Sequence, residues 1–196
     1  MPNMERVPES ATKTYPLPPA NKDEVVLAGG GVNPELTQNV ADLLEIHVAP
    51  VSKKRHGNGE LDAHFEESVR GKDVYIIQSH ASANGYTITE AVFEHQMLVQ
   101  AASGSDANSV TAIAPYLGYS RGERKSRGRQ AVPAILTIEN YENAGRKSPK
   151  FRMLSVDLHA PQTSEHLRTG PYEHLIAQEE LRYAVVKNLG SEAVKN

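Results

Sequence analysis

The chain has 196 residues, of which 21 are lysine or arginine and 24 are aspartate or glutamate, so its formal net charge is −3. This length suits one α/β domain, with or without a tail. The near-neutral charge argues against a dedicated nucleic-acid-binding protein, which usually carries a strong basic excess. The chain has no cysteine, which excludes disulfide scaffolds, cysteine zinc sites and thiol nucleophiles.

The N-terminal segment is polar and rich in proline. We interpret residues 1–22 as a flexible arm and residues 23–196 as one domain. The arm lacks the apolar core of a signal peptide, and no apolar run in the chain approaches the ~20 residues of a membrane span. The sequence therefore predicts a cytoplasmic protein that does not enter a membrane.

Short apolar runs alternate with helical patterns along the rest of the chain. Asn33 and Pro34 are typical of a helix N-cap and a first helical residue, and the apolar residues after them have helical spacing. Residues 61–65 alternate between apolar and polar side chains, as in a half-buried strand. The patterns predict strands at 24–28, 46–51, 61–65, 74–78, 110–114 and 151–156. They also predict a charged turn at 52–55 and a polar loop at 118–130. One helix is expected to begin at Pro34, and three others are expected at 90–102, 134–142 and 179–189.

Strands that alternate with helices imply an α/β fold, with a mostly parallel sheet flanked by helices on both faces. In such folds the loops after the carboxyl ends of the strands lie along one edge of the sheet and carry the function. We therefore expect the functional residues in the loops that follow the predicted strands.

The most charged loop follows the strand predicted at 110–114. Residues 119–129 contain five cationic side chains and one carboxylate. Arginine offers a bidentate fork and lysine a point charge, so this loop suits a polyphosphate ligand. A solvated basic loop without a ligand is an equally good interpretation of this run taken alone.

A second candidate follows the strand predicted at 151–156. Asp157 and His159 are two residues apart, so in an extended chain their side chains point the same way. The pair can share a divalent cation, or Asp157 can orient His159 as a base. A purely structural hydrogen bond of the histidine to its neighbour remains the alternative.

Two weaker signals involve glycine. Asn58-Gly59 predicts a turn, and Glu60 beside it can accept a hydrogen bond from a ribose hydroxyl or an adenine amino group, although a plain turn is the more frequent case. Residues 29–31 are three glycines before a helix N-terminus, a geometry that can hold an anion. A tight turn from strand to helix explains these glycines equally well.

Taken together and in order, these segments resemble the ribose-phosphate pyrophosphokinase (phosphoribosyl pyrophosphate synthetase) family. The resemblance implies a phosphoribosyltransferase-like fold and a magnesium-dependent transfer of the β,γ-diphosphate of ATP to ribose 5-phosphate, with release of AMP. It spans roughly residues 25–189, and it is carried by Asn58-Gly-Glu60, by residues 67–79, by residues 110–129, and by Val156-Asp-Leu-His-Ala160 with Gln162.

The resemblance also implies roles for individual residues. Asn58 and Glu60 would contact adenine, with His56 in the place of the usual stacked aromatic residue. His159, with Asp157 beside it, would hold Mg²⁺. By this resemblance the ATP-binding residues are His56, Asn58, Gly59, Glu60, Arg121, Gly122, Arg124 and Lys125; the metal ligands are His159 and Asp157; and the catalytic residues are His159, Arg121 and Lys125.

The chain also departs from the family pattern. Gly122-Glu123 stands where the family has Gln-Asp, and no stretch of these residues matches the acidic, glycine-rich loop that cradles ribose 5-phosphate in the family's second domain. We therefore expect the ATP-side N-terminal half of a synthetase that forms homo-oligomers, is incomplete for turnover, and has its ribose 5-phosphate site outside this chain. The alternative hypothesis is a non-catalytic, synthetase-associated regulatory protein, and a phosphoribosyltransferase acting on a base ranks last.

Overall fold

The computed structural model describes residues 21–189, whose contacts divide them into two compact units. Residues 21–175 form the first unit, and residues 176–189 belong to the second. Most of the expected proline-rich arm therefore lies outside the described residues. Lys22, at the end of that arm, begins a short 3₁₀ helix (Lys22–Glu24).

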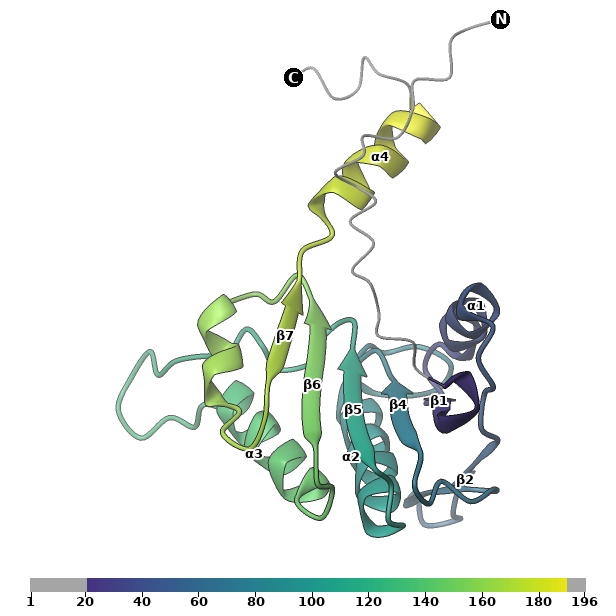
Figure 1. Ribbon diagram of the computed structural model, residues 1–196. Coiled ribbons are helices and arrows are strands. Elements are labelled where there is room, and N and C mark those ends of the chain that lie inside the picture. The colour runs from purple at the N-terminus through teal and green to yellow at the C-terminus, as the bar shows by residue number, and fades with distance from the viewer. Residues whose placement is uncertain (1–20, 190–196) are drawn as a thin grey trace, which may run out of the picture. The chain divides into compact units, whose positions relative to one another are not determined.

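Five parallel strands form the central sheet of the first unit (Figure 1). Their order in the sheet follows their order in the sequence, and each strand pairs in parallel with the next. All the carboxyl ends therefore lie at one edge of the sheet. The strands are β1 (Val25–Gly29), β4 (Asp73–Ile77), β5 (Ser109–Ala114), β6 (Phe151–Val156) and β7 (Tyr172–Leu175).

Helices cover both faces of this sheet, as the sequence predicts. Helix α1 (Pro34–Leu44) packs on the face that contains Leu27. Helices α2 (Ile88–Gly104) and α3 (Pro133–Gly145) pack on the opposite face, which contains Val26 (Figure 1). Neighbouring residues of β1 face opposite ways because side chains alternate along a strand. All of β1 is therefore buried, as in a strand covered on both faces.

The starts of the helices follow local sequence signals. The Asn33 side chain accepts a hydrogen bond from the Leu36 backbone N–H at 3.1 Å, and Pro34 is the first residue of α1. Thr87 and Glu90 form a capping box at the start of α2, in which each side chain accepts a backbone N–H of the other. The N-cap predicted at Asn33 is confirmed.

The strand predicted at 46–51 and the turn predicted at 52–55 are wrong. The charged segment is itself a strand, β2 (Val51–Arg55), which pairs antiparallel with β3 (Leu61–Phe65). Of the expected strand, Val48 makes only an isolated bridge to Leu27. Residues 53–55 are exposed on a separate two-stranded sheet, so strand formation does not bury their charged side chains in the core.

Two elements after β6 have no counterpart in the sequence analysis, namely the 3₁₀ helix η3 (Pro161–His166) and the edge strand β7. The second unit contains helix α4 (Gln178–Leu189), which confirms the helix predicted at 179–189. Across residues 21–189, every helix is too short or too polar to cross a membrane.

Candidate functional site

The loops after β5 and β6 begin side by side at the carboxyl edge of the sheet. The two strands are neighbours, with Ala114 paired to Ser155. The Val156 backbone N–H donates to the Pro115 carbonyl oxygen at 3.3 Å, which joins the starts of the two loops. The structure therefore brings together the starts of the two loops that contain the basic residues and the segment at 157–159.

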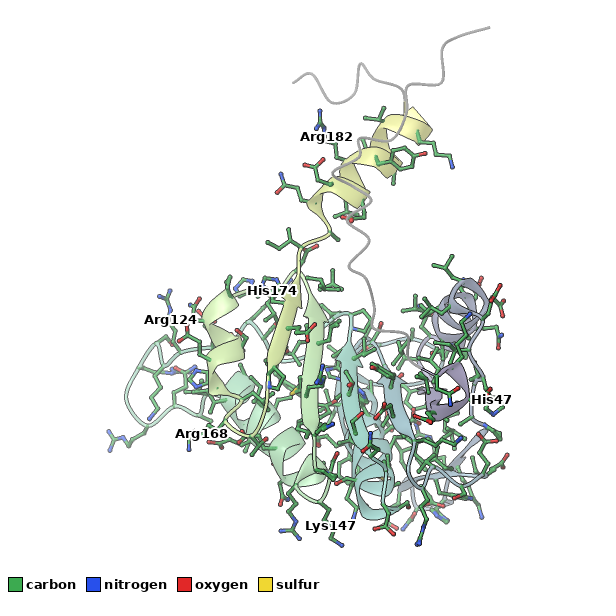
Figure 2. The ribbon with its side chains drawn as sticks, in the orientation of Figure 1. His47, Arg124, Lys147, Arg168, His174 and Arg182 are labelled. Carbon is green, nitrogen blue, oxygen red and sulfur yellow. The ribbon has the colours of Figure 1, made fainter. Side chains whose placement is uncertain are left out.

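The basic loop, residues 118–130, has no helix or strand, as predicted. The Tyr119 hydroxyl lies 2.7 Å from Thr89 Oγ1, which ties the start of the loop to the first turn of α2. Figure 2 shows Arg124 on this loop, away from the strands; its guanidinium lies 3.6 Å from the Glu123 carboxylate. Arg121 and Lys125 are exposed, and within residues 21–189 neither has a carboxylate partner. Both cations are therefore available to an anionic ligand.

Helix α3 approaches Gly122 so closely that a larger residue at this position would be crowded. A Cβ at this position would lie 2.9 Å from Cδ of Pro133, the first residue of α3. The Gly122 backbone N–H donates to the Tyr119 carbonyl oxygen at 2.9 Å, and its own carbonyl oxygen accepts from the Ala134 N–H at 3.3 Å. Gly122 therefore joins the basic loop to α3, and its backbone polar groups are already used within the protein.

The segment at 157–159 turns the chain out of β6. Asp157 has a φ of 46°, in the left-handed region that a non-glycine residue rarely adopts. The chain is therefore not extended here, as the sequence argument assumes. The Asp157 and His159 side chains are nevertheless both exposed at the edge, with Leu158 buried between them.

These two side chains are the candidate ligands for a metal ion. Within residues 21–189 there is no group of three or more histidine, aspartate or glutamate side chains that can hold one. Mg²⁺ is commonly bound through one or two carboxylates, with substrate phosphates and water completing its coordination. Asp157 lies at the edge where the loop after β5 also begins, and a carboxylate is a type of ligand that suits a magnesium ion.

The candidate adenine-binding residues form an exposed turn between β2 and β3. The His56 N–H donates to the Glu60 carbonyl oxygen at 2.8 Å, and the Glu60 N–H donates to the Asn58 side chain at 3.2 Å. Gly59 has a φ of 92°, which requires glycine. In residues 21–189 no hydrogen bond or ion pair joins this turn to the basic loop. The structure therefore does not bring the adenine-binding and phosphate-binding candidates into contact.

Arg55 ties this turn to the rest of the domain. Its guanidinium binds the carboxylate of Glu90 in the first turn of α2 and lies 3.4 Å from the Gly59 carbonyl oxygen. The hydrogen bond from Arg55, together with those from Thr87, lowers the pKa of Glu90 to about 2. The first turn of α2 thus contacts the basic loop through Thr89, and through Glu90 it contacts Arg55, the residue before the turn at 56–60.

The three glycines at 29–31 form a tight turn around a buried carboxylate of the protein itself. The Gly31 N–H donates to the Glu94 carboxylate at 2.6 Å, and the Val32 N–H donates to the Gln78 side chain at 3.2 Å. Glu94 also accepts from Gln78 and from the Tyr86 hydroxyl. The anion-binding interpretation of these glycines is therefore not needed. Sequence analysis missed Glu94, because nothing local in α2 distinguishes it from an exposed glutamate.

Two buried histidines support the start of the basic loop. His80 Nδ1 accepts from the Gly118 N–H at 3.0 Å, so its proton is on Nε2, which faces His95 and the Tyr141 hydroxyl. His95 Nε2 donates to the Ile76 carbonyl oxygen at 3.1 Å. Burial lowers the pKa of His95 to about 3 and that of His80 well below its usual value. Both histidines therefore serve the packing of the domain and are not exposed as ligands.

These features define the class of the protein. A parallel sheet covered on both faces carries a basic loop and an aspartate–histidine pair on adjacent strands, at their carboxyl edge. This is the arrangement of an α/β domain whose candidate ligand site lies at the carboxyl ends of its strands.

Comparison with known proteins identifies the family. Residues 25–145 match the family described as the N-terminal domain of ribose phosphate pyrophosphokinase. The chain therefore belongs to the ribose-phosphate pyrophosphokinase family, in agreement with the resemblance found in its sequence. The match includes the hairpin turn and the basic loop, and it ends before the segment at 157–159.

Individual relatives extend the similarity beyond that match. The chain is 37% identical over 153 residues to ribose-phosphate pyrophosphokinase of Bifidobacterium longum, an alignment that covers 78% of this chain and 42% of the relative. It is 35% identical over 157 residues to the Corynebacterium efficiens enzyme of the same name, covering 80% and 46%. The crystal structure of phosphoribosylpyrophosphate synthetase from Mycobacterium smegmatis superposes with a TM-score of 0.75 at 32% identity, covering 84% of this chain and 52% of that chain. The chain thus spans about half the length of the proteins it matches.

Proposed function

We propose that this chain is the ATP-side domain of a ribose-phosphate diphosphokinase. In this reaction the β,γ-diphosphate of Mg²⁺-ATP passes to ribose 5-phosphate, which gives phosphoribosyl pyrophosphate and AMP. The observation that supports the proposal is the hydrogen bond from Val156 to Pro115, which joins the starts of the loops after β5 and β6. A polyphosphate and its magnesium ion need both cations and a carboxylate, and these two loops supply them.

Each group has a role that follows from charge and geometry. Arg121 and Lys125 would bind the phosphates and offset the charge that develops during transfer. Asp157 and His159 would hold the magnesium ion, which would supply positive charge to offset that of the phosphates. Diphosphate transfer needs little covalent chemistry from the protein, so positioning and charge stabilisation are the contributions expected of these side chains.

The partners of this reaction belong to the same proposal. The hairpin turn at 56–60 would bind adenine, and ribose 5-phosphate would bind outside these residues. Homo-oligomerisation and a cytoplasmic location stay predictions. The coverage of about half of each relative supports the expectation that the 196-residue chain alone turns over little substrate.

Gly122 keeps the regulatory alternative open. The family has glutamine at this position by the resemblance above, whereas here Pro133 occupies the space that a side chain would need. A site remodelled in this way favours a domain that binds a synthetase and modulates it. Such a protein would associate with a full-length synthetase without binding Mg²⁺-ATP.

The test is AMP release from Mg²⁺-ATP by the purified chain, with and without ribose 5-phosphate, and calorimetry of Mg²⁺-ATP binding on the same sample. We expect Mg²⁺-ATP binding that is lost in Arg121→Ala, with little AMP release. Release that depends on ribose 5-phosphate would show that the chain is a functional synthetase by itself. Failure to bind Mg²⁺-ATP would overturn the proposal, and co-elution with a full-length synthetase in size-exclusion chromatography would then support the regulatory alternative.

A further inference from the structure

Strand β7 holds the segment at 157–159 through two hydrogen bonds. The Asp157 backbone N–H donates to the Leu175 carbonyl oxygen at 2.9 Å. The next backbone N–H, that of Leu158, donates to Nε2 of His174 at 2.8 Å. Figure 2 shows His174 on β7 at the carboxyl edge of the sheet. One side chain of β7 therefore reaches the backbone between the two candidate magnesium ligands.

This hydrogen bond determines which ring nitrogen of His174 carries the proton. An N–H group donates to Nε2, so Nε2 must present its lone pair. The neutral ring then carries its proton on Nδ1. Only this tautomer of His174 can hold the Leu158 amide in the observed position.

The conformation that His174 supports is not one that the segment favours by itself. Asp157 has a left-handed φ, which residues other than glycine rarely adopt. Leu158 is only 8% exposed, whereas Asp157 and His159 are exposed on either side of it. Fixing the Leu158 amide therefore fixes the direction in which both flanking side chains leave the backbone.

We propose that His174, as its Nδ1–H tautomer, is the positioning residue that presents Asp157 and His159 to Mg²⁺-ATP. This inference rests on the proposed function, since it assigns the two side chains to the metal. His174 acts through the Leu158 backbone and does not itself touch the ion. Groups that orient metal ligands in this way typically change metal affinity by roughly 10- to 100-fold when they are removed.

Three variants of the 196-residue chain separate positioning from general disruption. His174→Gln keeps an acceptor oxygen at about the reach of Nε2, and His174→Leu removes the acceptor. Glu173→Leu places the same leucine on the neighbouring, exposed position of β7, whose side chain points to the opposite face of the sheet. Thermal unfolding of the three variants identifies any loss of the fold itself.

The first measurement does not depend on ATP. In ¹⁵N-labelled protein, NMR is expected to show His174 with a protonated Nδ1 and an unprotonated Nε2. The Leu158 amide is expected to exchange with solvent about tenfold faster in His174→Leu than in the wild type or in Glu173→Leu. A protonated Nε2, or unchanged exchange of Leu158, overturns the inference.

The second measurement is calorimetry of Mg²⁺-ATP binding. We expect affinity to fall roughly 10- to 100-fold in His174→Leu, to be largely retained in His174→Gln, and to be unchanged in Glu173→Leu. Equal affinity of His174→Leu and the wild type overturns the inference and leaves the proposed function intact. If the wild type does not bind, the proposed function fails, and the exchange of Leu158 still decides whether His174 fixes the segment.

Discussion

The polar groups beneath the carboxyl edge of the sheet and those above it differ in how they are paired. Beneath the edge, the buried Glu94 carboxylate accepts three hydrogen bonds, and His80 is hydrogen-bonded through both ring nitrogens. Above it, the cations of the basic loop are exposed. Of these loop cations, only Arg124 has a carboxylate of the described residues within 4 Å. The hydrogen-bonded groups beneath the edge, Glu94 and His80 among them, form a rigid internal support for the loops. The cations of the basic loop, by contrast, are exposed to a ligand.

Acidification should cause the largest loss of folding stability, because the histidines of the internal support are buried without a charge. Burial holds the histidine pKa values below 6.5, so the unfolded chain binds protons that the folded chain excludes. The stability that depends on neutral His80 and His95 is fully present above pH 6.5 and decreases as the pH falls below it, because the unfolded chain takes up protons that the buried rings exclude. Urea unfolding between pH 7 and 4.5 measures this slope.

His95→Gln is the control for the acid effect. Glutamine can still donate to the Ile76 carbonyl oxygen, but it does not titrate. We expect this variant to be less stable than the wild type at pH 7 and to have a shallower slope below pH 6.5. Equal slopes in the two proteins would show that other groups cause the acid sensitivity.

Glu94→Ala should destabilise the domain more than any exposed substitution does. It leaves the Gly31 N–H, the Gln78 amide and the Tyr86 hydroxyl without their acceptor. Each unpaired buried donor costs about 1–3 kcal/mol, so we expect a loss of about 3 kcal/mol or more in urea unfolding. Glu139→Ala, at an exposed glutamate of α3, should stay within about 0.5 kcal/mol of the wild type.

Arg121→Ala should weaken ligand binding and leave the support intact. Hydrogen bonds to charged groups contribute about 1.5–3 kcal/mol, which corresponds to roughly 10- to 100-fold in the Kd for Mg²⁺-ATP. Arg146→Ala removes the same charge just after α3, outside the loop, and should bind like the wild type. Equal weakening in both variants would indicate a general effect of net charge.

The smallest and most local effect is expected from the pair Gly122→Ala and Gly128→Ala, compared by their thermal stability. Both change the basic loop, but an added Cβ at Gly122 lies 2.9 Å from Pro133, whereas at Gly128 it meets nothing within 4 Å. Overpacking of this kind costs about 1–3 kcal/mol, so only Gly122→Ala should lower the thermal midpoint. Similar midpoints would mean that α3 moves freely to accommodate the side chain.

Sequence signals predicted the main sheet and its loops better than the outlying elements. The buried strands and the N-cap at Asn33 have clear local patterns, and the structure confirms them. The segment at 51–55 is too charged to look like a strand, and β7 has only four residues, which alternate in exposure. Both segments are strands with exposed residues. Their structure depends on pairing with a neighbouring strand more than on apolar content.

The residues of the candidate site also divide into those that local sequence patterns predicted and those that they missed. Arg121, Asp157 and His159 were predicted because they follow strands and carry suitable charge, and their shared edge follows from parallel pairing. Their roles in binding stay predictions. Glu94 and His174 were missed because their significance depends on partners 63 and 16 residues away in the sequence.

The sequence by itself determined four of the five strands of the main sheet, namely all but β7, which loops carry charge, and the family to which the chain belongs. These properties depend on local periodicity and on the order of motifs along the chain. Only the tertiary structure decided that a buried carboxylate occupies the glycine turn and that a histidine of β7 holds the Leu158 amide. The physical reason is that buried backbone N–H groups must find acceptors, and the packing of distant elements decides which acceptor lies within reach.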